Sequence, residues 1–320
     1  MLDLNSFLAL PTAEVARLVA ERPRTCVFPI NGTRRWYLLE RLLGEWAAEG
    51  GAPPSSEAEY LSDYLARTAQ AQVALARLFF SHGIRTLMVS LFGSSLLERG
   101  DDYVSIGFEE GLARIGRDPA YHDFYREMGV RVRFYGDYRR VLPGLGYAHL
   151  IDLFDEVMAA TRGNDRHLLM FGLCADDPVE TVAQLAIAHH QAHGRPPTKR
   201  ELTAAYYGEE LDGVDLFIGF DKPCVFDVPL LDMGDADLYY LVSPSPYLAE
   251  RQLRRILYDH LYARRMAEQD YTDLSPAALQ AMKTFYDLNR EATLGLGRKH
   301  AAGDFWYPVP QVRLPDGMEG

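Results

Sequence analysis

The chain has 320 residues, enough for one large α/β domain or two average ones, and we favour one. Its formal net charge of −12 and pI near 5.2 argue against general binding to nucleic acids or anionic membranes, which needs a positive surface. The three widely spaced cysteines form neither a disulfide framework nor a CxxC metal site, and no apolar run is long enough to cross a bilayer. We therefore expect a cytoplasmic protein with no nucleic-acid partner and no membrane insertion.

Six short segments rich in apolar and β-branched residues recur along the chain, separated by segments with helical patterning. In chain order they are "TCVFPI" (25–30), "TLMVSLF" (86–92), "VRVRFYG" (130–136), "HLLMFGL" (167–173), "VDLFIGF" (214–220) and "LYYLVS" (238–243). Nearly continuous apolar strands that alternate with helices are typical of a parallel sheet covered on both faces. We therefore predict an α/β fold, a single domain over residues 1–320 with a mostly parallel six-stranded sheet flanked by helices.

Two further features concern the helices and the end of the chain. Residues 56–81 carry apolar side chains at helical spacing, which predicts a long helix with one face on the core. Ser55 or Ser56 is expected to cap this helix, and Thr198 to cap a later one. From about residue 290 the sequence shows no regular pattern, so we predict an irregular tail that packs over the domain or its partner.

The stretch "VFPINGTRRWYLLE" (27–40) joins the first predicted strand to a helix through an Asn-Gly turn. A helix that begins near Thr33 would place unbonded backbone N–H groups at the carboxyl edge of the sheet, where open α/β folds bind ligands. Arg34 and Arg35 in the first helical turn oppose the helix dipole, which is easier to understand if an anion lies between them. This pattern indicates a seat for a diphosphate; the alternative is an ordinary turn with solvated arginines.

The residues of this turn and of three later segments resemble motifs of the cis-prenyltransferase family, which includes undecaprenyl diphosphate synthase. The segments are "INGTRRW" (30–36), "HGIRTLMVSLF" (82–92), "VRVRFYGDYRRVLP" (130–143) and "VDLFIGF" (214–220). They follow one another in the family's order, and the resemblance spans roughly residues 25 to 260. It implies a cis-prenyltransferase-like fold.

An offshoot of that family, the tuberculosinol synthases or tuberculosinyl adenosine transferases, resembles the chain more closely. The shared motifs are "FPINGTRRW" (28–36), "FYGDY" (134–138), "YYGE" (206–209), "DLFIGF" (215–220) and "LRRILYDH" (253–260). The resemblance implies an enzyme that ionises an allylic diterpene diphosphate and passes the cation to water or to a nucleoside nitrogen.

Two departures from the chain-elongating enzymes bear on the chemistry. Where those enzymes hold a second diphosphate with "IRTSGE", this chain has Gly219, Phe220 and Asp221, which are poor ligands for that group, so elongation is not expected. Where the family carries an aspartate, the chain has Asn31, a weak neutral ligand for Mg²⁺. Either arginines and N–H groups hold the leaving group, or Mg²⁺ is the cofactor but is held weakly, or an aspartate has been replaced by design.

The resemblance also assigns site residues by position. It implies catalytic roles for Asn31, Arg34, Arg35 and Tyr64, with Asn31 as the weak metal ligand, and substrate contacts for Gly32, Thr33 and Trp36. Tyr60 is added because it lies one helical turn from Tyr64, and Phe92, Ser94 and Ser95 because they follow the carboxyl end of the second predicted strand. A phenol can stabilise a carbocation through its ring face and can hold a water molecule through its oxygen. The alternative for Tyr60 and Tyr64 is an ordinary place in the core.

Three other patterns have simpler interpretations than a site. "DDPVE" (176–180) reads as a helix start with Asp177 as the N-cap and proline in the first helical position. His189 and His193 share a helix face but lack a third metal ligand. The helix at 253–265 has apolar positions suited to a symmetric contact, so we expect a homodimer, with diphosphate neutralisation by its arginines as the alternative.

The function expected from these observations is that of a diterpene synthase, which releases diphosphate from an allylic, bicyclic C20 prenyl diphosphate and forms an alcohol or an olefin. Two alternatives stay open: transfer of the terpenyl group to a nucleoside such as adenosine, and a non-catalytic partner subunit in which Asn31 marks a lost activity.

Overall fold

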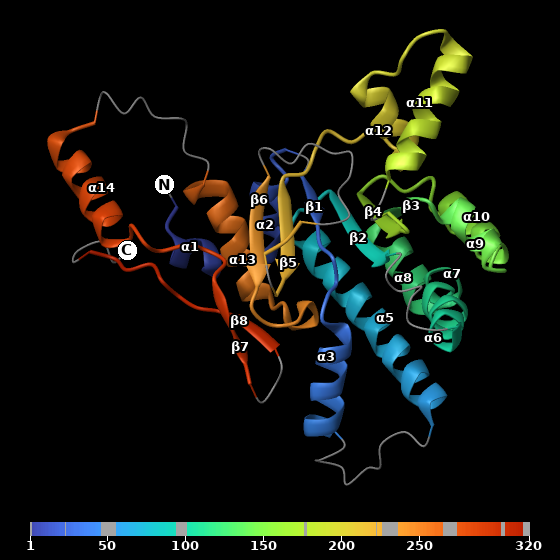
Figure 1. Cartoon of the computed structure of the whole chain (residues 1–320), viewed down its shortest axis with the longest axis horizontal. Helices are drawn as coiled ribbons and strands as arrows, with labels where there is room; N and C mark the ends of the chain where they lie inside the picture. Colours follow the sequence, from blue (N-terminus) through green and yellow to red (C-terminus); the bar gives the residue numbers. More distant parts are fainter. Residues whose placement is uncertain are drawn as a thin grey trace.

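The computed structural model describes residues 2–22, 24–45, 56–93, 101–175, 178–221, 223–225, 236–264, 274–301 and 305–315. Its centre is a six-stranded sheet in the order β3-β4-β2-β1-β5-β6, in which all neighbouring strands are parallel (Figure 1). The strands are β1 (Thr25–Val27), β2 (Thr86–Phe92), β3 (Val130–Tyr135), β4 (His167–Leu173), β5 (Leu216–Phe220) and β6 (Asp237–Leu241). The predicted α/β fold and its six strands are confirmed.

Helices cover both faces of this sheet. They are α1 (Leu4–Ala9), α2 (Thr12–Val19), α3 (Thr33–Leu38), η1 (Leu39–Glu45), α5 (Glu57–Ser81), α6 (Asp101–Ile106), η3 (Gly107–Leu112), α7 (Arg114–Arg117), α8 (Pro119–Met128), α9 (Tyr138–Gly144), α10 (His149–Ala160), α11 (Val179–His193), α12 (Lys199–Tyr207), η4 (Ser245–Tyr247), α13 (Glu250–Tyr258), η5 (Asp259–Ala263) and α14 (Pro276–Leu288). Side chains alternate between the two faces along each strand. In β1, Cys26 joins the larger core with α2, α5, α8, α10 and α13, whereas Val27 joins a smaller core that α12 covers.

Helix α5 is the long helix that the sequence predicts at residues 56–81, and it runs across the sheet (Figure 1). Ser56 is its N-cap, because the Ser56 hydroxyl accepts a hydrogen bond from the Glu59 N–H at 3.2 Å. Five positions of its predicted core face are buried, namely Leu61, Tyr64, Thr68, Leu75 and Phe79. Thr198 likewise caps α12 and forms a capping box with Glu201.

The start of α11 differs from the prediction. Pro178 stands directly before the helix, in the N-cap position, so α11 begins one residue later than expected. The predicted N-cap, Asp177, lies outside the described residues. Glu180 is in the first turn as expected, where a carboxylate interacts favourably with the helix dipole.

Two of the motifs shared with the tuberculosinol-forming offshoot pack on each other. The ring of Tyr135, from "FYGDY", lies 5.1 Å from that of Tyr207 and 6.1 Å from that of Tyr206, both from "YYGE". In the same motif, Glu209 accepts a hydrogen bond from Arg133 Nε at 2.8 Å. These motifs therefore attach α12 to the edge strand β3, a structural role.

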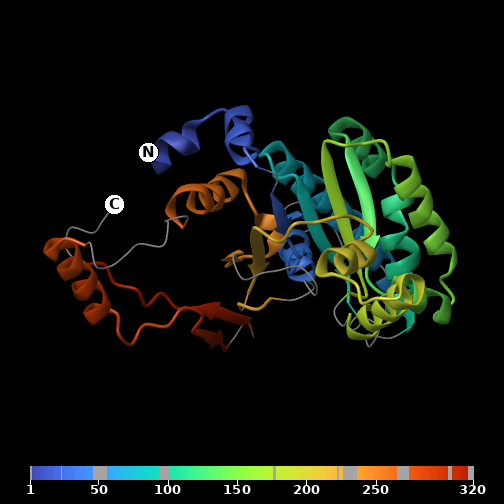
Figure 2. The ribbon, with the colours of Figure 1, turned by 90° about the horizontal axis from the view of Figure 1, so that it is seen from above.

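The end of the chain is more regular than the sequence indicates. After α14, β7 (Gly297–His300) and β8 (Phe305–Pro308) pair as an antiparallel hairpin, so the prediction of an irregular tail from residue 290 is wrong over these residues. The ring of Trp306 lies against Gly297, where an added Cβ would come within 2.1 Å of it. Figure 2 shows α14 at the opposite end of the molecule from α10, with the hairpin nearer to the sheet.

The helix predicted to make a symmetric contact has a different role. Leu253, Ile256 and Leu257 on α13 are buried inside the chain, and the neighbouring Tyr258 ring lies 5.6 Å from Phe7 of α1. The apolar face of α13 is therefore covered by the N-terminal helices of the same chain, and it does not supply the symmetric surface. The homodimer itself stays a prediction.

Arg254 on the same helix also has a structural role. Its guanidinium is buried and donates hydrogen bonds to the carbonyl of Leu8 at 3.2 Å, to Thr12 Oγ1 at 2.8 Å and to Glu250 Oε1 at 2.7 Å. A buried cation with this many partners fixes the N-terminal segment on α13. Of Arg254 and Arg255, the two arginines of this helix considered for diphosphate neutralisation, Arg254 is therefore excluded, whereas Arg255 is exposed and its role stays a prediction.

Replacing Arg254 should destabilise the fold. We expect Arg254→Ala to lower the free energy of unfolding by about 1–3 kcal/mol, because it leaves the partly buried acceptors at Leu8 and Thr12 without their donor. Urea unfolding measures the change. The control is Arg255→Ala, at an exposed position on the same helix, which should stay within about 0.5 kcal/mol of the wild type. Equal stability of the two variants would contradict the structural role.

Candidate functional site

The candidate site lies at the point in the sheet where the strand order reverses, between β1 and β5. The chain leaves β1 towards β2 on one side, and leaves β5 towards β6 on the other, although β1 and β5 are neighbours. Open α/β folds bind ligands at such a switch point, in the crevice outside the carboxyl ends of the strands. The loop after β1 carries residues 31–35, and the loop after β5 begins with Asp221. The turn at residues 31–35, which the sequence predicts to bind diphosphate and which is called the diphosphate turn below, therefore lies where this topology favours a ligand site.

The backbone of the turn is held by the segment that follows β6. The Asn31 N–H donates to Ser245 Oγ at 3.1 Å, and the Asn31 carbonyl accepts from the Ser245 N–H at 3.0 Å. Ser245 is fully buried and its hydroxyl also donates to the Pro29 carbonyl at 3.3 Å. These bonds fix the turn in front of α3, so that the first N–H groups of that helix, which have no intrahelical acceptor, point to the carboxyl edge.

Gly32 is required for this turn. It is the N-cap of α3 and has φ 74° and ψ 13°, a left-handed conformation that glycine adopts without steric penalty. A Cβ at this position would lie 2.7 Å from a ring carbon of Phe220 and 3.0 Å from Cβ of Pro244. Gly32 thus allows the ends of β1, β5 and β6 to approach one another closely.

Arg34 and Arg35 both stand exposed in the first turn of α3, as predicted. The Arg35 guanidinium carbon lies 5.3 Å from the centre of the Phe220 ring, and Arg35 Nη2 donates to Asp221 Oδ2 at 3.3 Å. Phe220 and Asp221, two of the three residues that differ from the chain-elongating motif, therefore contact Arg35, the predicted catalytic arginine.

Three tyrosines form the wall of the site beside α3. Tyr64 is buried and its hydroxyl lies 2.6 Å from Thr33 Oγ1, so the predicted catalytic tyrosine is joined to the diphosphate turn. Its ring is 5.5 Å from that of Tyr37, which in turn is 5.2 Å from Tyr60. The partly buried Trp36 packs against the same cluster.

Tyr37 and its partner Asp63 were not predicted from the sequence. Tyr37 donates to Asp63 Oδ2 at 2.6 Å, and Arg41 Nε donates to the same oxygen at 3.0 Å. Burial, and then the bond to Asp63, raise the pKa of Tyr37 to about 12. Burial raises the pKa of the Asp63 carboxyl, but the hydrogen bonds from Tyr37 and Arg41 outweigh it and leave that pKa below its ordinary value. Near neutral pH, Tyr37 is therefore a donor and Asp63 an anion.

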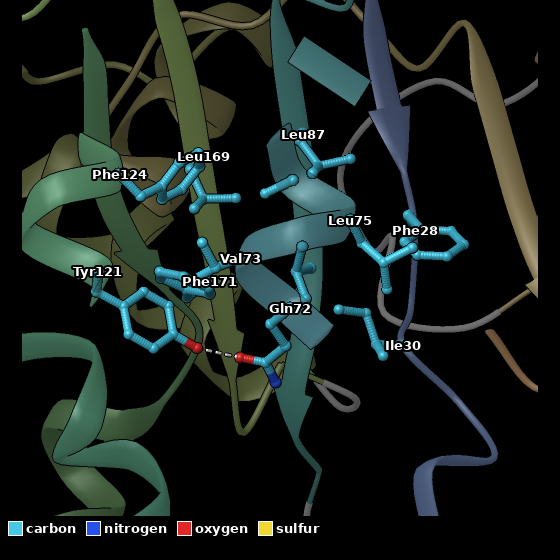
Figure 3. Close-up of a pocket in the computed structure, with 12 residues that line it drawn as sticks. Phe28, Ile30, Gln72, Val73, Leu75, Leu87, Tyr121, Phe124, Leu169 and Phe171 are labelled. Carbon is cyan, nitrogen blue, oxygen red and sulfur yellow. Dashed lines mark hydrogen bonds between the residues drawn. The ribbon is translucent and has the colours of Figure 1, made fainter. Parts of the chain in front are cut away.

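An apolar cavity lies directly behind the turn, between the sheet and helices α5 and α8 (Figure 3). Its lining comprises Phe28, Ile30, Gln72, Val73, Leu75, Ala76, Leu87, Val89, Tyr121, Phe124, Leu169 and Phe171. Ile30 immediately precedes Asn31, so the cavity begins next to the diphosphate turn. Its volume in this structure is about 10 Å³, room for about one water molecule. A hydrocarbon chain can enter only if these side chains move.

One polar pair interrupts the apolar lining. The Tyr121 hydroxyl donates to Gln72 Oε1 at 2.5 Å, and Figure 3 shows this bond between α8 and α5. Burial raises the pKa of Tyr121, so its hydroxyl remains protonated. The pair therefore satisfies two polar groups that face the cavity.

The remaining predicted residues are less informative. Phe92 lies at the end of β2 as expected, but it is buried with its ring 4.6 Å from Phe108 of η3. Ser94 and Ser95 lie outside the described residues. His189 and His193 have rings 4.4 Å apart, yet the described part of the chain contains no cluster of three or more His, Cys, Asp or Glu side chains that could hold a metal.

The residues at the turn do not fit a tightly held Mg²⁺. Asn31 offers a neutral amide in place of a carboxylate, and the nearby carboxylate of Asp221 is paired with Arg35. The donors around the turn are cationic or N–H groups, which suit an anion.

In the described ranges, no helix is both long and apolar enough to cross a membrane.

Two solved structures share the fold of this chain. A probable undecaprenyl diphosphate synthase from Campylobacter jejuni superposes with a TM-score of 0.53 and 15% identity, over 77% of this chain and 98% of that one. Lavandulyl diphosphate synthase from Lavandula x intermedia, in complex with dimethylallyl diphosphate, superposes with a TM-score of 0.55 and 12% identity, over 78% of this chain and 97% of that one. The chain has the cis-prenyltransferase fold.

Sequence similarity identifies the branch. Tuberculosinyl adenosine transferase from Mycobacterium tuberculosis is 38% identical over 92% of this chain and 95% of its own length. (+)-Kolavelool synthase from Herpetosiphon aurantiacus is 26% identical over 95% of each chain. No protein-family model matches. The chain belongs to the tuberculosinyl adenosine transferase-like offshoot of the cis-prenyltransferases, as the motifs predict.

The close approach at Gly32 leads to a testable expectation. Gly32→Ala should destabilise the protein by about 1–3 kcal/mol, because it strains the backbone and displaces the Phe220 ring. It should also weaken the binding of inorganic diphosphate. Urea unfolding and calorimetric titration measure the two effects.

The matched control is Gly44→Ala in η1, where an added Cβ meets nothing within 4 Å. This variant should be as stable as the wild type or slightly more so, since alanine restricts the unfolded chain. If Gly32→Ala behaved like Gly44→Ala, the turn would not depend on the glycine.

Proposed function

We propose that this protein ionises an allylic, bicyclic C20 prenyl diphosphate, releases diphosphate, and forms a terpene alcohol or olefin. The observation that carries the proposal is the turn at residues 31–35, which places N–H groups and two arginines at the switch point, directly in front of an apolar cavity. An anionic head group and a hydrocarbon tail need these two environments side by side. The synthase and the transferase among the relatives support chemistry of this kind.

The turn would act on the leaving group. Charge accumulates on the diphosphate as the carbon–oxygen bond breaks, so donors that are already in place stabilise the transition state more than the ground state. The backbone N–H groups of Thr33 and Arg34 and the guanidinium groups of Arg34 and Arg35 supply such donors. Mg²⁺, if carried in by the diphosphate, would add charge neutralisation there; Asn31 is the side chain beside it.

The tyrosine wall would act on the cation. Tyr64 lies against Thr33, beside the turn from which the leaving group would depart, and Tyr37 and Tyr60 continue the same aromatic surface. Ring faces stabilise a neighbouring positive charge without reacting with it. The Tyr64 hydroxyl, which is bonded to Thr33, would hold a water molecule and so give an alcohol, or would accept a proton and so give an olefin.

A second candidate is transfer of the terpenyl group to adenosine or a similar nucleoside. The 38% identity with the adenosine transferase favours it. The ionisation step is the same in both candidates, and only the nucleophile differs.

One assay separates the candidates. The protein is incubated with C15 and C20 allylic diphosphates, with and without adenosine, and both diphosphate release and organic products are measured. Alcohol or olefin alone supports the synthase, whereas an adenosine adduct supports the transferase. Absence of turnover with every substrate, also after Asn31→Asp, would refute the catalytic function and favour a partner subunit.

Removing either arginine should abolish most of the activity without loss of stability. We expect Arg34→Ala and Arg35→Ala each to lower kcat by about 10²–10³, as for other donors to a developing anion. The melting temperature should hardly change, because both side chains are exposed and a surface ion pair contributes only about 0–1 kcal/mol. If activity and melting temperature fell together, the arginines would be structural.

The role of residue 31 can be tested by restoring the carboxylate. We expect Asn31→Asp to raise kcat/KM and its dependence on Mg²⁺ together, because a charged oxygen ligand replaces a neutral one. Turnover is measured over a Mg²⁺ series that ends in chelator. Weaker diphosphate binding and unchanged metal dependence would instead show that arginines and N–H groups hold the leaving group alone.

A further inference from the structure

Asp221 has an unusual backbone conformation at the end of β5. Its φ is 70°, and among the described residues only Cys174 shares a positive φ without being glycine. Aspartate tolerates this region better than most residues, but the conformation still costs on the order of 1 kcal/mol and requires support from its surroundings. The support is visible, because the Asp221 N–H donates to the Leu241 carbonyl of β6 at 3.2 Å.

This conformation turns the Asp221 side chain to Arg35. The carboxylate Oδ2 accepts from Arg35 Nη2 at 3.3 Å, while the ring of Phe220 lies 5.3 Å from the guanidinium carbon. The Phe220 side chain is itself fixed, because it is buried and its ring packs directly against Gly32. Two consecutive residues of β5 and its loop thus hold the guanidinium from two directions.

We propose that Asp221 is a positioning residue that, together with Phe220, orients the Arg35 guanidinium toward the leaving diphosphate. The proposal rests on the function proposed above. A guanidinium has five N–H donors in one plane, so a bond to Asp221 fixes its orientation and leaves other donors for the diphosphate. Without this bond, Arg35 would remain charged but would sample many rotamers.

A purely electrostatic role predicts the opposite result. The Asp221 carboxylate is an anion close to a site for another anion, so Coulomb repulsion alone would make Asp221→Asn bind diphosphate more tightly. Orientation of Arg35 predicts weaker binding and slower turnover. The sign of the change therefore distinguishes the two roles.

The test is a double-mutant cycle with Asp221→Asn, Arg35→Ala and the combined variant. We expect Asp221→Asn alone to weaken the binding of inorganic diphosphate, measured by calorimetry, by about tenfold. It should lower kcat more than it changes KM, because the oriented donor is needed most in the transition state. In the Arg35→Ala background the same change should have no further effect. Asparagine keeps the side-chain shape and tolerates the left-handed conformation, so the fold should persist.

Two further variants complete the design. Phe220→Leu removes the ring beside Arg35 and should change binding in the same direction as Asp221→Asn. Asp123→Asn is the control, since Asp123 pairs with Arg126 at 2.6 Å on the surface of α8, and it should leave diphosphate binding unchanged.

Several outcomes would overturn the proposal. Tighter diphosphate binding by Asp221→Asn would show a repulsive charge, and an additive loss in the Arg35→Ala background would show a role unrelated to Arg35. A wild type that binds no diphosphate would also refute it. A wild type that binds diphosphate but turns over no prenyl diphosphate would refute the proposed function, while the binding cycle would still decide the role of Asp221.

Discussion

The close contact between the turn after β1 and the end of β5 is the constraint on which the site depends. Because Gly32 has no side chain, the Phe220 ring can lie beside the turn, and Arg35 can lie over that ring. The segment after β6 completes the arrangement through Ser245, which forms hydrogen bonds with both the N–H and the carbonyl of Asn31. Three adjacent strands of the sheet therefore determine where a few polar groups stand, as expected for a site on rigid elements.

In this arrangement, helices α3 and α5 contribute different groups to the site. Helix α3 brings cationic groups, N–H groups and Tyr37 to the edge of the sheet, whereas α5 brings Tyr60, Tyr64 and part of the apolar lining of the cavity. Tyr64 joins the two helices through its contact with Thr33. A change in the position of α5 would therefore alter the polar and the apolar part of the site together.

Sequence patterns predicted the parts of this protein that depend on local or periodic signals. The six strands, the helix at 56–81 and the turn at 31–35 belong to this group, because burial and turn chemistry leave a regular trace in the residues. The contact of Asp221 with Arg35 and that of Tyr37 with Asp63 join residues 186 and 26 positions apart, and no local pattern encodes such pairs. The same holds for the covered face of α13: its amphipathic pattern shows that it is buried but not which segment buries it.

The small volume of the cavity behind the turn has a consequence for the thermodynamics of binding. If the hydrocarbon of the proposed substrate enters this cavity, the empty and the occupied protein must differ in the packing of α5 and α8 against the sheet, because sites for small molecules have volumes of about 300–1,000 Å³. Part of the intrinsic affinity for the hydrocarbon is then used to separate side chains that already contact one another. Shortening a lining residue would lower that cost, so a variant with a less stable fold could bind its substrate more tightly.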